Sequence, residues 1–109
     1  MSYVETPEYS GLEVDVGQYV EMLCNTSLTS DIMWTYDNDD GGYVDYVYWN
    51  GRVDNQKPRL FVKSIADHFH FLVIPHAEPK HSGLYECYDG KGTRKVGYQL
   101  VVHGMRSMV

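Results

Sequence analysis

Apolar residues alternate with polar or small residues along short stretches of the chain. Leu12, Val14 and Val16 occupy every second position, so their side chains share one face of an extended segment. Residues 20–24 repeat this alternation. The 3.6-residue period of an amphipathic helix is not sustained anywhere, which predicts an all-β fold.

Turn-forming residues divide this pattern into short elements. Residues 37–42 are rich in Asp, Asn and Gly, and Asn50-Gly51 is a strong hairpin signal. These boundaries predict eight or nine strands, at residues 11–16, 20–24, 32–36, 43–48, 52–53, 60–63, 68–74, 84–88 and 96–102. We expect one domain over residues 1–103, followed by a tail or linker at 104–109.

Composition and charge narrow the function classes. The chain has 109 residues, of which 43% are hydrophobic and 22% charged, as in a globular domain. Its formal net charge is −6, and Lys91, Arg94 and Lys95 form a small basic cluster, which argues against nucleic-acid binding. No apolar run approaches the ~20 residues of a membrane span, so we expect no direct membrane insertion. The first six residues lack the basic and apolar parts of a signal peptide.

Two cysteines, Cys24 and Cys87, stand 63 residues apart. They are too few for a zinc site built on thiolates alone. A disulfide between them would stabilise the fold by about 4 kcal/mol in the loop-entropy model. Two free, buried thiols in a reducing compartment are the alternative.

The surroundings of the cysteines resemble the immunoglobulin superfamily over residues 12–102. Trp34 follows Cys24 by ten residues, and Tyr85 lies two residues before Cys87 in the run His-Ser-Gly-Leu-Tyr-Glu-Cys. The family has Asp-Ser-Gly-x-Tyr-x-Cys there, and a tryptophan packs on its inter-sheet disulfide. The resemblance implies a two-sheet Greek-key β-sandwich with a Cys24–Cys87 inter-sheet disulfide. Trp34 would cover the sulfurs, Tyr85 would form the tyrosine corner, and Gly83 would supply a sharp turn.

Departures from the family pattern refine these expectations. His81 stands where the family has an aspartate that pairs with an arginine, here Arg59, so that pair would be weakened or replaced by Arg59–Glu78. The extra strands before Arg59 are similar to the variable type or a close intermediate type. The turn after Cys87 is too short for an antigen-recognition loop. Binding through a sheet face is therefore the favoured interpretation.

The predicted partner surface is the outer face of the sheet that carries Trp34 and Cys87, the front sheet. Thr35 follows Trp34 and Tyr88 follows Cys87, so alternation turns Thr35 and Tyr88 outward. Aromatic residues crowd the neighbouring strand, and tyrosine and tryptophan are frequent in interfaces. The alternative is that these rings only cover the core and its rim. The predicted partner-binding residues are Thr35, Tyr43, Tyr46, Tyr48, Trp49 and Tyr88.

A second apolar surface is expected on the opposite, back sheet. There Phe69, Phe71 and Val73 would lie near Tyr19 and Leu23, unless a bulge shifts the alternation. Alternation from Cys87 turns His70, Leu72 and Ile74 inward, and Phe69, Phe71 and Val73 outward.

Asn25-Thr26-Ser27 fits the N-glycosylation pattern, at the start of a loop. Asn25 is therefore the predicted glycosylation site. Two histidines, at 68 and 70, have a spacing that can hold zinc, and the aspartates of 37–40 are similar to part of a calcium loop. Neither set is completed by further ligands. Ser82 and His81 are adjacent in a strand and point to opposite faces, so they make no catalytic pair. We expect no enzyme activity, no metal site and no cofactor.

The function that these observations favour is extracellular protein recognition by a receptor or adhesion domain. Its partner would be a protein ligand, with a homodimer as one possibility, and it would bind through the front sheet. A secreted immune-type recognition module is the first alternative. An intracellular structural domain of a muscle-type protein is the second, and it predicts reduced cysteines. This step from fold to function is an analogy.

Overall fold

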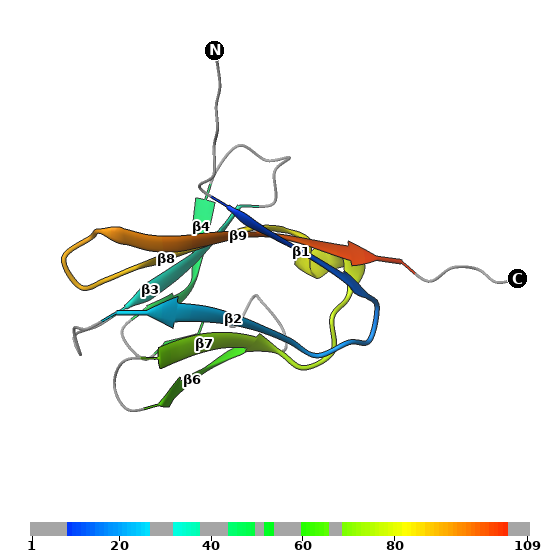
Figure 1. The fold of residues 1–109 in the computed structure, drawn as a ribbon, viewed down its shortest axis with the longest axis horizontal. Coiled ribbons are helices and arrows are strands. Elements are labelled where there is room, and N and C mark those ends of the chain that lie inside the picture. Colours follow the sequence, from blue (N-terminus) through cyan, green and yellow to red (C-terminus); the bar gives the residue numbers. More distant parts are fainter. Residues whose placement is uncertain are drawn as a thin grey trace, which may run out of the picture.

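The computed structural model describes residues 9–26, 32–37, 44–49, 52–53, 60–65 and 69–104. These ranges form strands and one short 3₁₀ helix, arranged as two facing layers (Figure 1). The elements are β1 (Ser10–Asp15), β2 (Val20–Asn25), β3 (Met33–Asp37), β4 (Val44–Trp49), β5 (Arg52–Val53), β6 (Phe61–Ile65), β7 (Phe69–Ile74), η1 (Pro79–His81), β8 (Gly83–Tyr88) and β9 (Arg94–His103).

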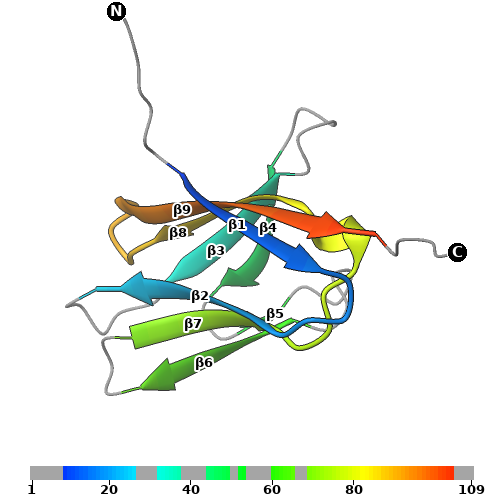
Figure 2. The same cartoon turned by 45° about the vertical axis from the view of Figure 1, so that its right-hand side comes forward.

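The front sheet has the strand order β1-β9-β8-β3-β4-β5, and the back sheet has the order β2-β7-β6. β1 pairs with β9 in parallel, whereas the other described pairs are antiparallel. Figure 2 shows the two layers from a second direction. The Cys24–Cys87 disulfide joins β2 of one sheet to β8 of the other. The prediction of an all-β, two-sheet sandwich with an inter-sheet disulfide is confirmed.

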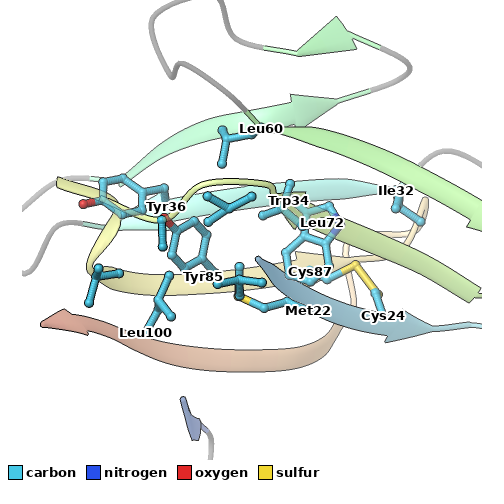
Figure 3. Close-up of a cluster of buried hydrophobic side chains, with 14 residues drawn as sticks. Met22, Cys24, Ile32, Trp34, Tyr36, Leu60, Leu72, Tyr85, Cys87 and Leu100 are labelled. Atoms are coloured by element: carbon cyan, nitrogen blue, oxygen red, sulfur yellow. A yellow bond between two sulfur atoms is a disulfide. The ribbon is translucent and has the colours of Figure 1, made fainter. Parts of the chain in front are cut away.

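Apolar residues at the inward-facing positions of the strands build the core between the two sheets. Cys24, Trp34 and Cys87 are fully buried, and Trp34 lies beside the disulfide (Figure 3). Leu12 and Val14 of β1 pack against the edge of the core. Val16, expected on the same face, lies beyond the end of β1 and is exposed. Its N–H donates to His103 O at 3.0 Å.

Three tyrosine hydroxyls tie the core to the backbone around it. Tyr85 donates to His81 O, four residues before it, at 2.6 Å, which is the tyrosine-corner arrangement. Tyr36 donates to Ser82 O at 2.6 Å. Tyr98 donates to Leu23 O of the back sheet, also at 2.6 Å, and so links the two layers. Each hydroxyl satisfies a carbonyl that would otherwise be costly to bury.

The start of β8 depends on Gly83. Its φ is +150°, and a Cβ there would lie 2.6 Å from Tyr36 Cε1 and 2.7 Å from Asp37 O. The glycine is therefore needed for the close approach of Tyr36 as well as for its backbone conformation.

His81 is buried at the end of η1, where its Nδ1 accepts the Glu78 N–H at 2.9 Å. The expected partner of His81 or Glu78, Arg59, lies outside the described residues. Glu78 forms an ion pair with Lys80 at 3.3 Å.

Candidate protein-interaction surface

The outer face of the front sheet is set by alternation along β8. Tyr85 and Cys87 enter the core, so Glu86 and Tyr88 lie on the opposite face. In register, Glu86 lies between Thr35 of β3 and Gly97 of β9. The centre of the front face is thus a carboxylate.

Three side chains from different segments converge on this carboxylate. Tyr9 donates to Glu86 Oε2 at 2.8 Å, and Tyr88 donates to Oε1 at 2.7 Å. Arg94 Nε donates to Oε2 at 2.9 Å, and its guanidinium lies 5.0 Å from the centre of the Tyr9 ring. We call Tyr9, Glu86, Tyr88 and Arg94 the Glu86 cluster.

Tyr9 reaches Glu86 across an intervening strand. Ser10 pairs with Tyr98 and Glu86 pairs with Gly97, so β9 separates the two side chains. Two strands that flank a third lie about 10 Å apart, which is the distance that the Tyr9 side chain has to bridge. Gly97 has no side chain to obstruct the Tyr9 ring, which explains how the hydrogen bond can span β9.

Hydrogen bonding and partial burial shift the pKa values of Glu86, Tyr9 and Tyr88. Burial alone would raise the pKa of Glu86, but hydrogen bonds from Tyr88, Tyr9 and Arg94 together outweigh it and lower the pKa. Burial and the bond to Glu86 raise the pKa of Tyr9 to about 12. The bond to Glu86 also raises the pKa of Tyr88. At neutral pH the cluster is an ionised carboxylate held by two neutral phenols and a cation.

The predicted partner-binding residues whose side chains the structure describes, Tyr88 and Thr35, differ in burial. Tyr88 is half-buried on the front face, in the Glu86 cluster. Thr35 was expected to point outward as a contact residue, but it is only 8% exposed, on a strand flanked by β8 and β4. Tyr46 pairs with Thr35, Tyr48 with Trp34 and Trp49 with Met33 along β3 and β4. Tyr43 lies outside the described residues.

Sequence reasoning missed three members of the Glu86 cluster. Alternation with Tyr88 could have indicated Glu86, since both lie on one strand two residues apart. Arg94 was seen only as part of a small basic cluster. Tyr9 has no local signal, because its place depends on the parallel pairing of β1 with β9.

The outer face of the back sheet has a different chemistry. The β2–β7 and β6–β7 registers run without a bulge, so Phe69, Phe71 and Val73 alternate away from the core as expected. Phe69 is exposed and Phe71 is half-buried, but Val73 is fully covered. The other exposed apolar side chains of this face belong to Tyr19, Phe61 and Ile65.

A second glutamate lies within this apolar surface. Glu21 accepts hydrogen bonds from Tyr19 and from Lys63, each at 2.7 Å. The Lys63 ammonium also lies 5.2 Å from the centre of the Phe71 ring. We call Tyr19, Glu21 and Lys63 the Glu21 cluster.

Comparison with solved structures identifies the fold. The chain is similar to the chain in the "Crystal structure of the ZIG-8 IG1 homodimer", with a TM-score of 0.70 and 24% identity, over 94% of this chain and 85% of that one. The chain has the immunoglobulin fold. It is equally similar to a chain of the "ZIG-8-RIG-5 IG1-IG1 heterodimer", with a TM-score of 0.70, 24% identity, and coverage of 91% and 86%. No protein-family model and no curated protein sequence matches it.

Metal-ligand groups and membrane-spanning helices are both absent from the described residues. Among these residues, no three His, Cys, Asp or Glu side chains are grouped as metal ligands. In the same part of the chain, no helix has the length and hydropathy needed to cross a membrane.

Proposed function

We propose that this immunoglobulin domain is an extracellular recognition module that binds a protein through the outer face of its front sheet. A second copy of the chain is the first partner to test. Chains similar to this one were crystallised in a homodimer and in a heterodimer, which supports a protein partner. The disulfide supports an oxidising compartment.

The Glu86 cluster is the observation that carries this proposal. It presents two tyrosines and an arginine, which are residue types that dominate binding energy at interfaces. Their mutual hydrogen bonds hold them in place before a partner arrives. Less conformational entropy is then lost on binding, so more of the contact energy appears as affinity.

The proposed contact set extends from this cluster toward the strand next to β3. It contains Tyr88 and, from the sequence, Tyr43, Tyr46, Tyr48 and Trp49. Thr35 is left out of this set, since it is buried. We assign the domain to the variable type, because β4 and β5 extend the front sheet beyond β3.

Light scattering over a concentration series tests association of the purified chain with itself. We expect a concentration-dependent dimer, and we expect Tyr88→Ala to weaken its affinity at least ~10-fold, as for a residue worth more than 1.4 kcal/mol. Tyr19→Ala is the matched control. Tyr19 also donates to a glutamate two residues away on the same strand face, but it belongs to the back sheet.

Other outcomes separate the alternatives. A strict monomer with an intact disulfide would direct the search to a different protein partner, as for a secreted immune-type module. Free thiols in intact-mass spectra of the native protein would favour an intracellular structural domain. Equal weakening by Tyr88→Ala and Tyr19→Ala would contradict the assignment to the front sheet.

A further inference from the structure

The outer face of the back sheet carries a modification site next to exposed apolar side chains. We propose that Asn25 bears an N-linked glycan, and that its first sugars pack on Phe69 and Ile65. The inference uses the extracellular location in the proposed function, and it does not depend on the front-sheet interface.

Three side chains form one row across the end of the back sheet. Asn25 is the last residue of β2 and is exposed. It pairs with Phe69 of β7, which pairs with Ile65 at the end of β6. Phe69 is 37% exposed and Ile65 is 49% exposed. The arrowheads of β2 and β6 end at the same side of the sheet in Figure 2.

The three residues lie on the same face as well as in the same row. Met22 and Cys24 enter the core, so Asn25 has the outward parity of Glu21. Adjacent strands are about 4.8 Å apart, which places the Asn25 side chain within contact distance of the Phe69 ring. A group attached to the Asn25 amide therefore begins over Phe69.

The modification has a defined chemistry. Asn25-Thr26-Ser27 provides the asparagine and a hydroxyl residue two positions later. The Asn25 amide nitrogen forms a bond to the anomeric carbon of a sugar supplied by a lipid-linked sugar pyrophosphate. The amide loses one proton, and the lipid pyrophosphate departs with the bonding electrons. No change of oxidation state is involved.

A glycan suits this surface better than a second copy of the chain. Sugar rings have apolar C–H faces that pack on aromatic rings, while their hydroxyls remain in water. They would convert an exposed apolar row into a solvated surface. A protein partner would have to cover the neighbouring Glu21–Lys63 ion pair as well, which joins the two edge strands of the sheet at 2.7 Å. Desolvating that pair would oppose association.

Expression of the full chain through a eukaryotic secretory pathway tests the attachment. Peptide mass mapping before and after enzymatic glycan removal should locate the glycan at Asn25. The Ser27→Ala variant should be secreted without it. An unmodified Asn25 in the secreted, disulfide-bonded protein would overturn the proposal, and it would leave the front-sheet association measured with Tyr88→Ala unaffected.

Thermal unfolding of glycosylated protein against Ser27→Ala tests the packing. The glycan should raise Tm by about 4 °C, the size expected for one aromatic contact in a domain of this length. Phe69→Ser should abolish this increment. Phe61→Ser is the matched control, because Phe61 is 43% exposed on the same face but pairs with Val73, four residues from the Phe69 row.

Two results would contradict the packing. Equal glycan increments in Phe69→Ser and Phe61→Ser would show that the glycan does not contact the Asn25 row. A concentration-dependent mass of the Ser27→Ala protein that Phe69→Ser alone abolishes would assign the surface to a second copy of the chain.

Discussion

The two outer faces of the sandwich each carry a glutamate that accepts hydrogen bonds from a tyrosine and a cation. Glu86 on the front sheet binds Tyr9, Tyr88 and Arg94, whereas Glu21 on the back sheet binds Tyr19 and Lys63. Both carboxylates have a lowered pKa. The chemistry of the two clusters is similar, but their surroundings differ.

The difference lies in burial and in the number of segments that each cluster joins. The Glu86 side chain is 19% exposed and the Glu21 side chain is 31% exposed. The Glu86 cluster joins the segment before β1 to β8 and β9, whereas the Glu21 cluster joins β2 to β6. A more buried carboxylate with three donors is less screened by water and holds its neighbours more firmly. Although their charges are similar, the Glu86 cluster therefore holds its side chains in place on the front sheet, whereas the Glu21 cluster is a more solvated ion pair on the back sheet.

Gly83→Ala should have the largest effect, because β8 carries the centre of the front face. Its Cβ would meet Tyr36 Cε1 at 2.6 Å and Asp37 O at 2.7 Å, and its φ of +150° disfavours any side chain. We expect a loss of about 2–4 kcal/mol in the free energy of unfolding, measured with urea. Gly11→Ala in β1 is the control, since its Cβ would meet nothing within 4 Å. Similar stability of both variants would show that β8 does not need the close approach of Tyr36.

Removing each glutamate tests whether the Glu86 and Glu21 clusters contribute differently to the free energy of unfolding. Glu86→Ala leaves three donors without their acceptor on a partly buried surface, so we expect a loss of about 1–2 kcal/mol after allowance for solvent screening. Glu21→Ala should leave the free energy of unfolding unchanged within error, because its partners turn to water. Chemical unfolding of both variants measures this. Equal losses would mean that the two clusters contribute alike.

Acid should weaken the front cluster selectively. Hydrogen bonds lower the pKa of Glu86 in the folded state below its unfolded value of about 4.3. The corresponding stability is complete above that value and is lost as pH falls through the folded pKa. The urea midpoint of the wild type should therefore fall more than that of Glu86→Gln between pH 6 and pH 3, on the order of a few tenths molar. Parallel pH curves for the two proteins would argue against this linkage.

Local patterns in the sequence were enough to predict the fold and to favour its cross-link. Alternation of apolar residues is local, because each residue of a strand faces the side opposite to its neighbour. Cys24, Trp34, Tyr85 and Cys87 have distinct physical roles, so their spacing is specific to the immunoglobulin fold. The same alternation correctly oriented Phe69 and Phe71, since the back sheet has no bulge.

Which side chains meet on each face, and which are covered, depends on long-range strand pairing that the sequence pattern does not reveal. The parallel pairing of β1 with β9 brings Tyr9 to Glu86, 77 residues away. Thr35 is only 8% exposed, although alternation turns it outward. The register of three strands sets Asn25 beside Phe69 and Ile65. Alternation gives the side of a sheet on which a residue lies, whereas strand order and register, which depend on long-range pairing, give its neighbours.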